Sequence, residues 1–214
     1  LMPAAINTMQ AIQKLIMETE EVAAEAVNGN VKNAKLNIDD FTGEYKKIAS
    51  GFNNVIKAMQ RPLEETLQIL TKMAVNDYTV SMNTNYMGDF LVVSNSINDV
   101  QKRLLHVQNI AVKIAKGDIS ELENFRKAGK RSENDHISPA LISMMEAIQR
   151  LIDETEVFSE AAEDGNLNAR GDLERFEGEY RNIIMGFNRT LDAVAKPMKE
   201  VIEVMTQISE GNLN

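Results

Sequence analysis

The chain has 214 residues, of which 26% are charged and only 5% are aromatic, and it contains 12 Met but no Trp. This composition is typical of long helices, because Ala, Glu, Lys and Met lose little rotamer freedom on a helix. The absence of Cys excludes disulfides and thiolate metal sites. A net charge of −9 without a basic stripe argues against nucleic acid as a partner. With no membrane-length apolar run and no signal peptide, we expect a cytoplasmic chain, whose parent protein can still be membrane-anchored.

The chain repeats itself at an offset of about 135 residues. The segment PAAINTMQAIQKLIMETE from Pro3 is similar to PALISMMEAIQRLIDETE from Pro139. Further on, the sequence GFN at 51–53 returns at 186–188. A repeat of this length predicts an array of similar structural units.

Two shorter signatures divide the long repeat into helices. The first closes a helix with Gly or Asn, which tolerate the left-handed conformation of a C-terminal cap. Its copies begin at Gly29, Asn76, Gly117, Gly165 and Gly211. The second opens a helix with Gly, an acid and an aromatic residue, and the acid suits the positive end of the helix. Its copies begin at Gly43-Glu44, Gly88-Asp89 and Gly178-Glu179.

The segments between these signatures are expected to be connectors that run back along a helix. They comprise residues 29–42, 77–87, 117–135 and 165–177. A connector of about 13 residues reaches about 43 Å, whereas a helix of about 16 residues is about 24 Å long. Two successive helices can therefore start side by side and run parallel. Spaced apolar residues should hold the connectors on the helices, namely Val31, Leu36, Phe41, Leu167, Leu173 and Phe176.

Apolar residues in the expected helices follow a heptad spacing, which predicts coiled-coil packing. One stripe alternates steps of three and four, through Phe90, Val93, Ile97, Val100, Leu104, Val107, Ala111 and Ile114. The other contains one additional four-residue step, a stutter, and consists of Tyr45, Ile48, Phe52, Val55, Met59, Leu63, Leu67 and Leu70. Pro62 and Pro197 fall at the stuttered junctions, where proline suits the opening of a new helical segment. Because two helices cannot enclose their apolar stripes, we expect an all-α fold of concatenated parallel four-helix coiled-coil bundles. A homodimer would supply these bundles, with helices continuous between units.

The Pro-led first helix, the closing glycine, the apolar connector and the acid-led second helix resemble HAMP domains in tandem. Such arrays occur in methyl-accepting chemotaxis proteins and related sensors. The resemblance implies four complete units, with a second helix at 1–16 and a first helix at 196–214 belonging to neighbouring units. The complete units are 17–60, 61–103, 104–151 and 152–195.

The resemblance also implies a function. A HAMP array passes a conformational change from an input domain to an output domain of the same chain, and its partner is a second copy of itself. We therefore expect no catalysis, no cofactor, no metal, no nucleic acid and no small-molecule substrate. The expected signalling positions are glycines and acids of the two signatures, the two prolines and five connector residues. They are Gly29, Gly43, Glu44, Pro62, Gly88, Asp89, Gly117, Gly165, Gly178, Glu179, Pro197, Val31, Phe41, Leu167, Leu173 and Phe176.

Several alternatives remain. A passive coiled-coil spacer or dimerisation rod is the main one, although a plain rod has no use for recurring connectors. The array of a sensor histidine kinase is another. Glu133 and His136 have the spacing of a di-iron bundle motif, but the chain has only two His, so a polar helix start is favoured. Glu20-Glu21 resembles an adaptation-methylation pair, yet a solvated helix face explains it better.

Overall fold

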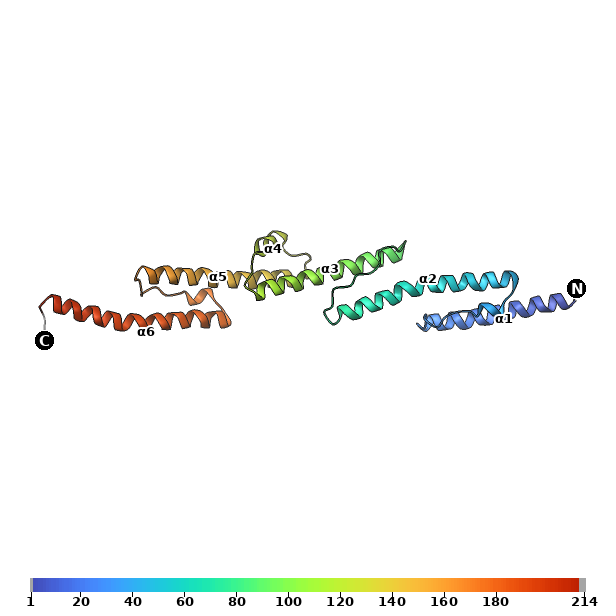
Figure 1. Ribbon diagram of the computed structural model, residues 1–214, viewed down its shortest axis with the longest axis horizontal. Coiled ribbons are helices and arrows are strands. Elements are labelled where there is room, and N and C mark those ends of the chain that lie inside the picture. Colours follow the sequence, from blue (N-terminus) through green and yellow to red (C-terminus); the bar gives the residue numbers. More distant parts are fainter. Residues whose placement is uncertain (1, 212–214) are drawn as a thin grey trace. The chain divides into compact units, whose positions relative to one another are not determined.

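The structure, a computed structural model, describes residues 2–211 except the side chains of residues 3 and 4. Within this range it contains six α-helices, two short 3-10 turns and no strand, so the expected all-α class is confirmed. The helices are α1 (Met2–Val27), α2 (Gly43–Met73), α3 (Asp89–Ala115), α4 (Leu122–Ala128), α5 (Ile137–Glu163) and α6 (Gly178–Ser209) (Figure 1). The 3-10 turns η1 (Ile38–Asp40) and η2 (Leu173–Arg175) lie just before α2 and α6.

Helices α1, α2, α3 and α5 each end in a residue with a positive φ. This residue is Gly29, Asn76, Gly117 or Gly165, with φ between 63° and 84°. The next amide then donates to the carbonyl five residues earlier, as the Asn30 N–H does to the Glu25 carbonyl at 2.8 Å. This bond satisfies a carbonyl that the helix end leaves open, so the expected left-handed caps are present.

Both prolines lie inside helices and not at their first turn. Pro62 is fully buried within α2, and Pro197 lies within α6. The structure thus differs from the expectation that proline opens a new segment. Proline cannot donate to the carbonyl of the fourth preceding residue, which is Ala58 for Pro62, but burial of its ring offsets part of that loss. Both helices therefore continue across the junctions.

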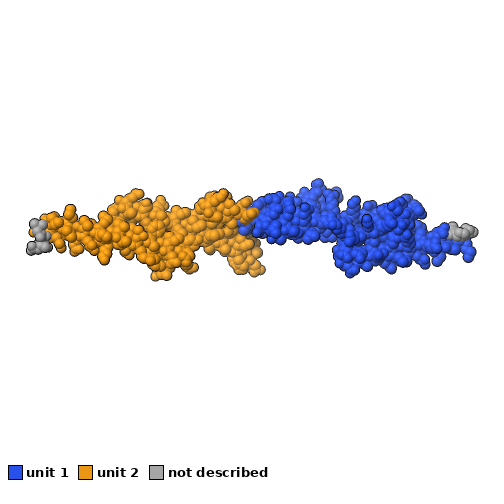
Figure 2. Space-filling view, turned by 60° about the horizontal axis from the view of Figure 1, so that its bottom comes forward, with its two compact units in different colours: residues 1–107 blue, residues 108–214 orange. Residues whose placement is uncertain are grey.

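Contacts between residues divide the chain into two compact units, residues 1–107 and 108–214 (Figure 2). In the first unit, α1 lies beside α2, and the connector between them runs back so that both helices point the same way (Figure 1). In the second unit, α5 and α6 follow the same course (Figure 1). The expected parallel arrangement of successive helices is therefore present within each unit.

Four apolar clusters, two in each unit, join the connectors to the helices. Every cluster contains at least one buried connector residue. These are Ala34, Leu36 and Phe41 in the first cluster along the chain, Met82 in the second, Leu122 and Phe125 in the third, and Phe176 in the fourth. The connectors thus form part of the core and do not hang free.

The third connector contains a helix, α4, that was not expected from the sequence. Leu122 and Phe125 lie three residues apart, so both face the same side and enter the third cluster. The residues around them include Glu, Arg, Lys and Ala, which favour helix. Gly129, with a φ of 60°, ends the helix.

Candidate functional site

The first connector is fixed to α2 by both packing and hydrogen bonds. Leu36 and Phe41 are each 3% exposed and pack beside Ala49 of α2. The Leu36 N–H donates to Asn53 Oδ1 at 2.7 Å, and Asn53 Nδ2 donates to the Leu36 carbonyl at 2.8 Å. One side chain therefore satisfies both backbone groups of a buried connector residue, which would otherwise be costly to bury. We call this two-bond contact an asparagine latch.

The same latch recurs in two further connectors. Asn98 of α3 pairs with the amide and carbonyl of Met82 at 2.7 and 2.9 Å. Asn188 of α6 pairs with those of Gly171 at 2.8 and 3.0 Å. Asparagine suits this role because its amide carries a donor and an acceptor side by side.

The sequence holds a signal for the latch that we did not interpret. Each latch asparagine lies ten residues after the glycine of an opening signature, at Gly43, Gly88 and Gly178. Its function depends on the return path of the connector, which the spacing alone does not define.

Gly171 shows how closely the fourth connector approaches the helices. A Cβ atom at this position would lie 2.6 Å from Ile184, 2.7 Å from Phe158 and 2.9 Å from Glu154. A side chain at this position would displace the side chains of Ile184, Phe158 or Glu154, so the close approach of this connector favours glycine.

The third connector has no asparagine at the matched position. Leu141 and Met145 of α5 are buried four residues apart, as Ser94 and Asn98 of α3 are, so Met145 is the residue that matches the latch asparagines. Met145 is 0% exposed and packs in one cluster with Leu122 and Phe125. The backbone of α4 forms its own bonds, for example from the Gly129 amide to the Phe125 carbonyl at 2.9 Å. The apolar Met145 therefore takes the place of a latch, and side-chain ion pairs of Glu121 with Lys113 at 2.8 Å and of Arg126 with Glu146 at 2.9 Å add to the contact.

Polar side chains surround the second connector more than the others. Glu65 of α2 accepts hydrogen bonds from the Asn83 amide at 2.6 Å and from the Tyr86 hydroxyl at 2.5 Å. Burial raises the pKa of Tyr86, and the bond to Glu65 raises it further. Ser94 and Gln101 of α3 donate to connector carbonyls. The second connector is thus held by a network of hydrogen bonds.

A carboxylate caps the helix that follows the third connector. Asp135 accepts hydrogen bonds from the backbone amides of Arg131, Ile137 and Ser138, each at 3.0 Å. These bonds, led by the one from Arg131, hold the pKa of Asp135 well below its usual range. The charged carboxylate satisfies amides at the start of α5, which is the role of an N-terminal cap.

Ion pairs between connector and first helix have opposite polarity in the two long repeats. In the first repeat Lys14 of α1 pairs with Asp40 at 3.1 Å. In the second, Arg175 occupies the position that matches Asp40, and it pairs with the buried Glu154 of α5 at 3.2 Å. The connector position is the same in the two repeats, but the partners lie one helical turn apart, because Lys14 matches Arg150 and Glu154 matches Glu18.

The structure distributes the predicted signalling residues over the connectors and does not gather them into one cluster. Gly43, Gly88 and Gly178 have φ of 55° to 57° and stand at the start of α2, α3 and α6. Their acidic neighbours Glu44, Asp89 and Glu179 lie in the first turns of those helices. Phe41 and Phe176 are buried, whereas Val31, Leu167 and Leu173 are half-buried. Gly211, at the end of the described range, has a φ of 83°.

The apolar stripe predicted as the bundle core is largely exposed in the single chain. On α2, Ile48 is 55% and Val55 58% exposed, whereas the next residues, Ala49 and Ile56, are buried. The same one-residue offset recurs on the other second helices. In each of the following pairs the first residue is exposed and the second is buried: Val93 and Ser94, Val100 and Gln101, Met144 and Met145, Ile183 and Ile184, and Val194 and Ala195. The connector side of each helix is therefore closed and the stripe beside it is open.

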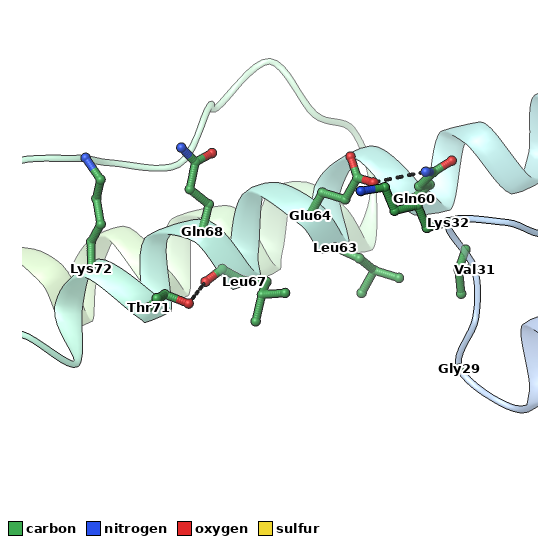
Figure 3. A pocket seen from close by; sticks show the side chains of 10 residues that line it. All are labelled: Gly29, Val31, Lys32, Gln60, Leu63, Glu64, Leu67, Gln68, Thr71 and Lys72. Carbon is green, nitrogen blue, oxygen red and sulfur yellow. Dashed lines mark hydrogen bonds between the residues drawn. The ribbon is translucent and has the colours of Figure 1, made fainter.

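A groove of about 760 Å³ lies along the second half of α2 (Figure 3). Leu63 and Leu67, 50% and 68% exposed, point toward the side on which Gly29 and Val31 lie (Figure 3). Both leucines belong to the open stripe. The groove is thus a wider part of the same exposed apolar surface.

Nothing in the described range indicates a metal site or a membrane span. Between residues 2 and 211 no group of three or more His, Asp or Glu side chains is placed to hold a metal ion. No helix of this range is both long and apolar enough to cross a membrane.

Parallel helices, left-handed caps and packed connectors define a helical repeat protein. A comparison with protein families matches residues 40–106 and 175–214, half of the chain, to the HAMP domain. The chain belongs to the HAMP domain family and is a signal-transduction module. The matched segments contain all three latch asparagines, Asn53, Asn98 and Asn188, while the third connector lies outside both. No curated protein and no solved structure gave a match.

Proposed function

We propose that the chain is a relay that passes a conformational change from an input domain to an output domain of a chemoreceptor-like protein. The proposal rests on the family and on one observation, the open apolar stripe beside every latched or packed connector. The relay works through packing, performs no chemistry itself and lies on the cytoplasmic side of its parent protein. Its units comprise residues 17–60, 61–103, 104–151 and 152–195.

The partner in this proposal is a second copy of the chain in parallel orientation. Large exposed apolar surfaces on a helical protein mark sites of association. Two copies supply four helices at each level, which is enough to enclose a bundle core. Since Leu63 and Leu67 line the groove and also continue the stripe of α2, we assign the groove to the partner copy as well.

Disulfide cross-linking tests the parallel dimer, because the chain contains no Cys. In the stripe, Ile48→Cys or Val55→Cys is expected to cross-link to its own copy in the partner. Lys46→Cys, on the exposed face of the same helix, is the matched control and is expected to remain unlinked. Cross-links between residues from opposite ends of the chain would show an antiparallel dimer and contradict the proposal.

The relay function of the chain is tested by changing the junction at Pro62. The stutter offsets the stripe by about 40–50°, because four residues turn about 400°. Deleting four residues around Pro62 would make residues 45–73 one heptad run. In the receptor that carries this array, the dimer is expected to persist while the output becomes locked or inverted. Normal signalling with an intact dimer would favour the passive spacer.

The array of a sensor histidine kinase is the second candidate. The family match supports it as well as a chemoreceptor, since both carry HAMP domains between input and output. Fusing the array to a chemoreceptor signalling tip or to a kinase core distinguishes them. Stimulus-dependent output from the kinase fusion alone would overturn the chemoreceptor assignment.

A further inference from the structure

We propose that Asn53, Asn98 and Asn188 are positioning residues that tie each connector to the second helix of its unit. The third connector, with Met145 at the matched position, is then the one that can move independently of its second helix. The inference rests on the proposed relay function, for it names the contacts through which a helix movement reaches the connectors. The hydrogen bonds on which the inference depends all lie within a single chain.

The first step is the burial of the latched residues. Leu36 is 3% and Met82 2% exposed, and Gly171 is also buried. All three lie in extended segments, where helical hydrogen bonds cannot serve the backbone. Buried backbone groups almost always have partners, and the asparagine amide supplies both at once.

The second step is the geometry of two bonds to one residue. An amide that accepts and donates on the same connector residue fixes that residue along the helix and around it. Sliding the helix by one turn, about 5.4 Å, would take both bonds out of range, and smaller sliding or rotation would stretch both together. A latched connector therefore moves with its second helix or loses two hydrogen bonds together.

The third step is the contrast at the third connector. Its short helix α4 makes its own backbone bonds and meets α5 through an apolar cluster that includes Met145. Apolar contact is not directional, so it tolerates small sliding and rotation of the two surfaces. Arg126 of α4 also donates to Glu146 of α5 through Nε at 3.1 Å and Nη2 at 2.9 Å. This pair joins two flexible side chains that are in part open to solvent and leaves the connector backbone untouched, so it constrains the connector weakly. In the described part of the chain this is the connector under which a second helix can turn.

Amide hydrogen exchange of the whole chain, followed residue by residue by NMR, tests the latch. In Asn53→Leu the Leu36 amide loses its acceptor, and its exchange is expected to become about tenfold faster or more. The matched control is Asn54→Leu, which changes the exposed neighbouring asparagine and should leave Leu36 unchanged. The Gly171 amide, in the fourth connector, should exchange at the wild-type rate in both variants. A general loss of stability would instead accelerate exchange at both amides.

Two further variants keep the test decisive if Asn53→Leu folds poorly. Asn53→Asp retains the acceptor for the Leu36 amide but loses the donor, so its exchange should lie between wild type and Asn53→Leu. Met145→Asn should give no new protection in the third connector, because Leu122 and Phe125, which pack with Met145, lie on a helix and not in an extended segment. Wild-type exchange of Leu36 in Asn53→Leu, or equal acceleration in Asn54→Leu, would overturn the latch. A monomeric chain would refute the dimeric relay but leave this test intact.

Discussion

The second and third connectors solve the same structural problem in opposite ways. The second connector is extended, and side chains of α2 and α3 bind its backbone, with Asn98 holding both groups of Met82. The third connector folds into α4 and presents Leu122 and Phe125 to an apolar cluster around Met145. The second connector is held mainly by directed hydrogen bonds, and the third connector mainly by burial of apolar area, with two ion pairs beside it.

This difference shows what an array of similar units can vary without losing its architecture. A connector must cover the helix side next to the open stripe, and its backbone must be satisfied. The backbone of an extended connector forms its hydrogen bonds with side chains of the helices, and these bonds tie the connector to the helices. The backbone of a helical connector forms its hydrogen bonds within its own helix. Such a connector needs only apolar packing against the neighbouring helices, so its coupling to them is looser.

The largest effect is expected from Phe125→Ala in the third connector. Removing a buried aromatic ring leaves a cavity, which should lower the free energy of unfolding by about 3–5 kcal/mol. Chemical denaturation followed by circular dichroism measures this change. Lys127→Ala, on the exposed side of the same short helix, should change it by less than about 0.5 kcal/mol. Equal stability of both variants would show that α4 is not seated on the bundle.

A smaller loss is expected from Asn98→Leu in the second connector. The substitution leaves the buried amide and carbonyl of Met82 without partners, which should cost about 1–3 kcal/mol. Met145→Leu, at the matched position of the third unit, conserves apolar volume and should cost less than about 1.5 kcal/mol. Denaturation curves for the two variants compare these costs directly. A larger loss of stability in Met145→Leu than in Asn98→Leu would show that hydrogen bonding does not distinguish the two connectors.

The smallest effect concerns pH and the hydroxyl of Tyr86. Its pKa is raised by burial and by Glu65, so the folded chain holds this proton more tightly than the unfolded chain. The resulting stability is present below the unfolded pKa of about 10 and is lost as pH rises through the folded value. In an ultraviolet titration one tyrosine should ionise later than the others, and Tyr86→Phe should remove this component. Uniform ionisation of all four tyrosines would contradict the contact.

Much of the fold follows from local features of the sequence. Gly29 and Gly165 mark helix ends because a left-handed residue is a local requirement, and the apolar spacing of Phe41 and Phe176 marks buried connector positions. The helix α4 was not predicted, because a seven-residue helix is too short to show a clear period. The latch of Asn53 was missed because it depends on where the connector returns.

The stripe shows a different limit of sequence interpretation. Heptad spacing selects Ile48 and Val55, while the single chain buries Ala49 and Ile56 instead. Both sets are apolar, and the period alone does not separate a side covered by the chain's own connector from one left for a partner. The offset of one residue becomes visible only when the connector is seen on the helix.

The open stripe leads to one direct measurement, the molar mass of the chain in solution by light scattering after size separation. In the proposed relay a second copy covers Ile48, Val55, Leu63 and Leu67, which are all at least half exposed in one chain. The account predicts a mass twice the 23.9 kDa of a single chain at micromolar concentration. A stable, helical species with the mass of one chain would contradict the account. The apolar stripe would then remain exposed to solvent, and no four-helix bundle would form to carry the signal.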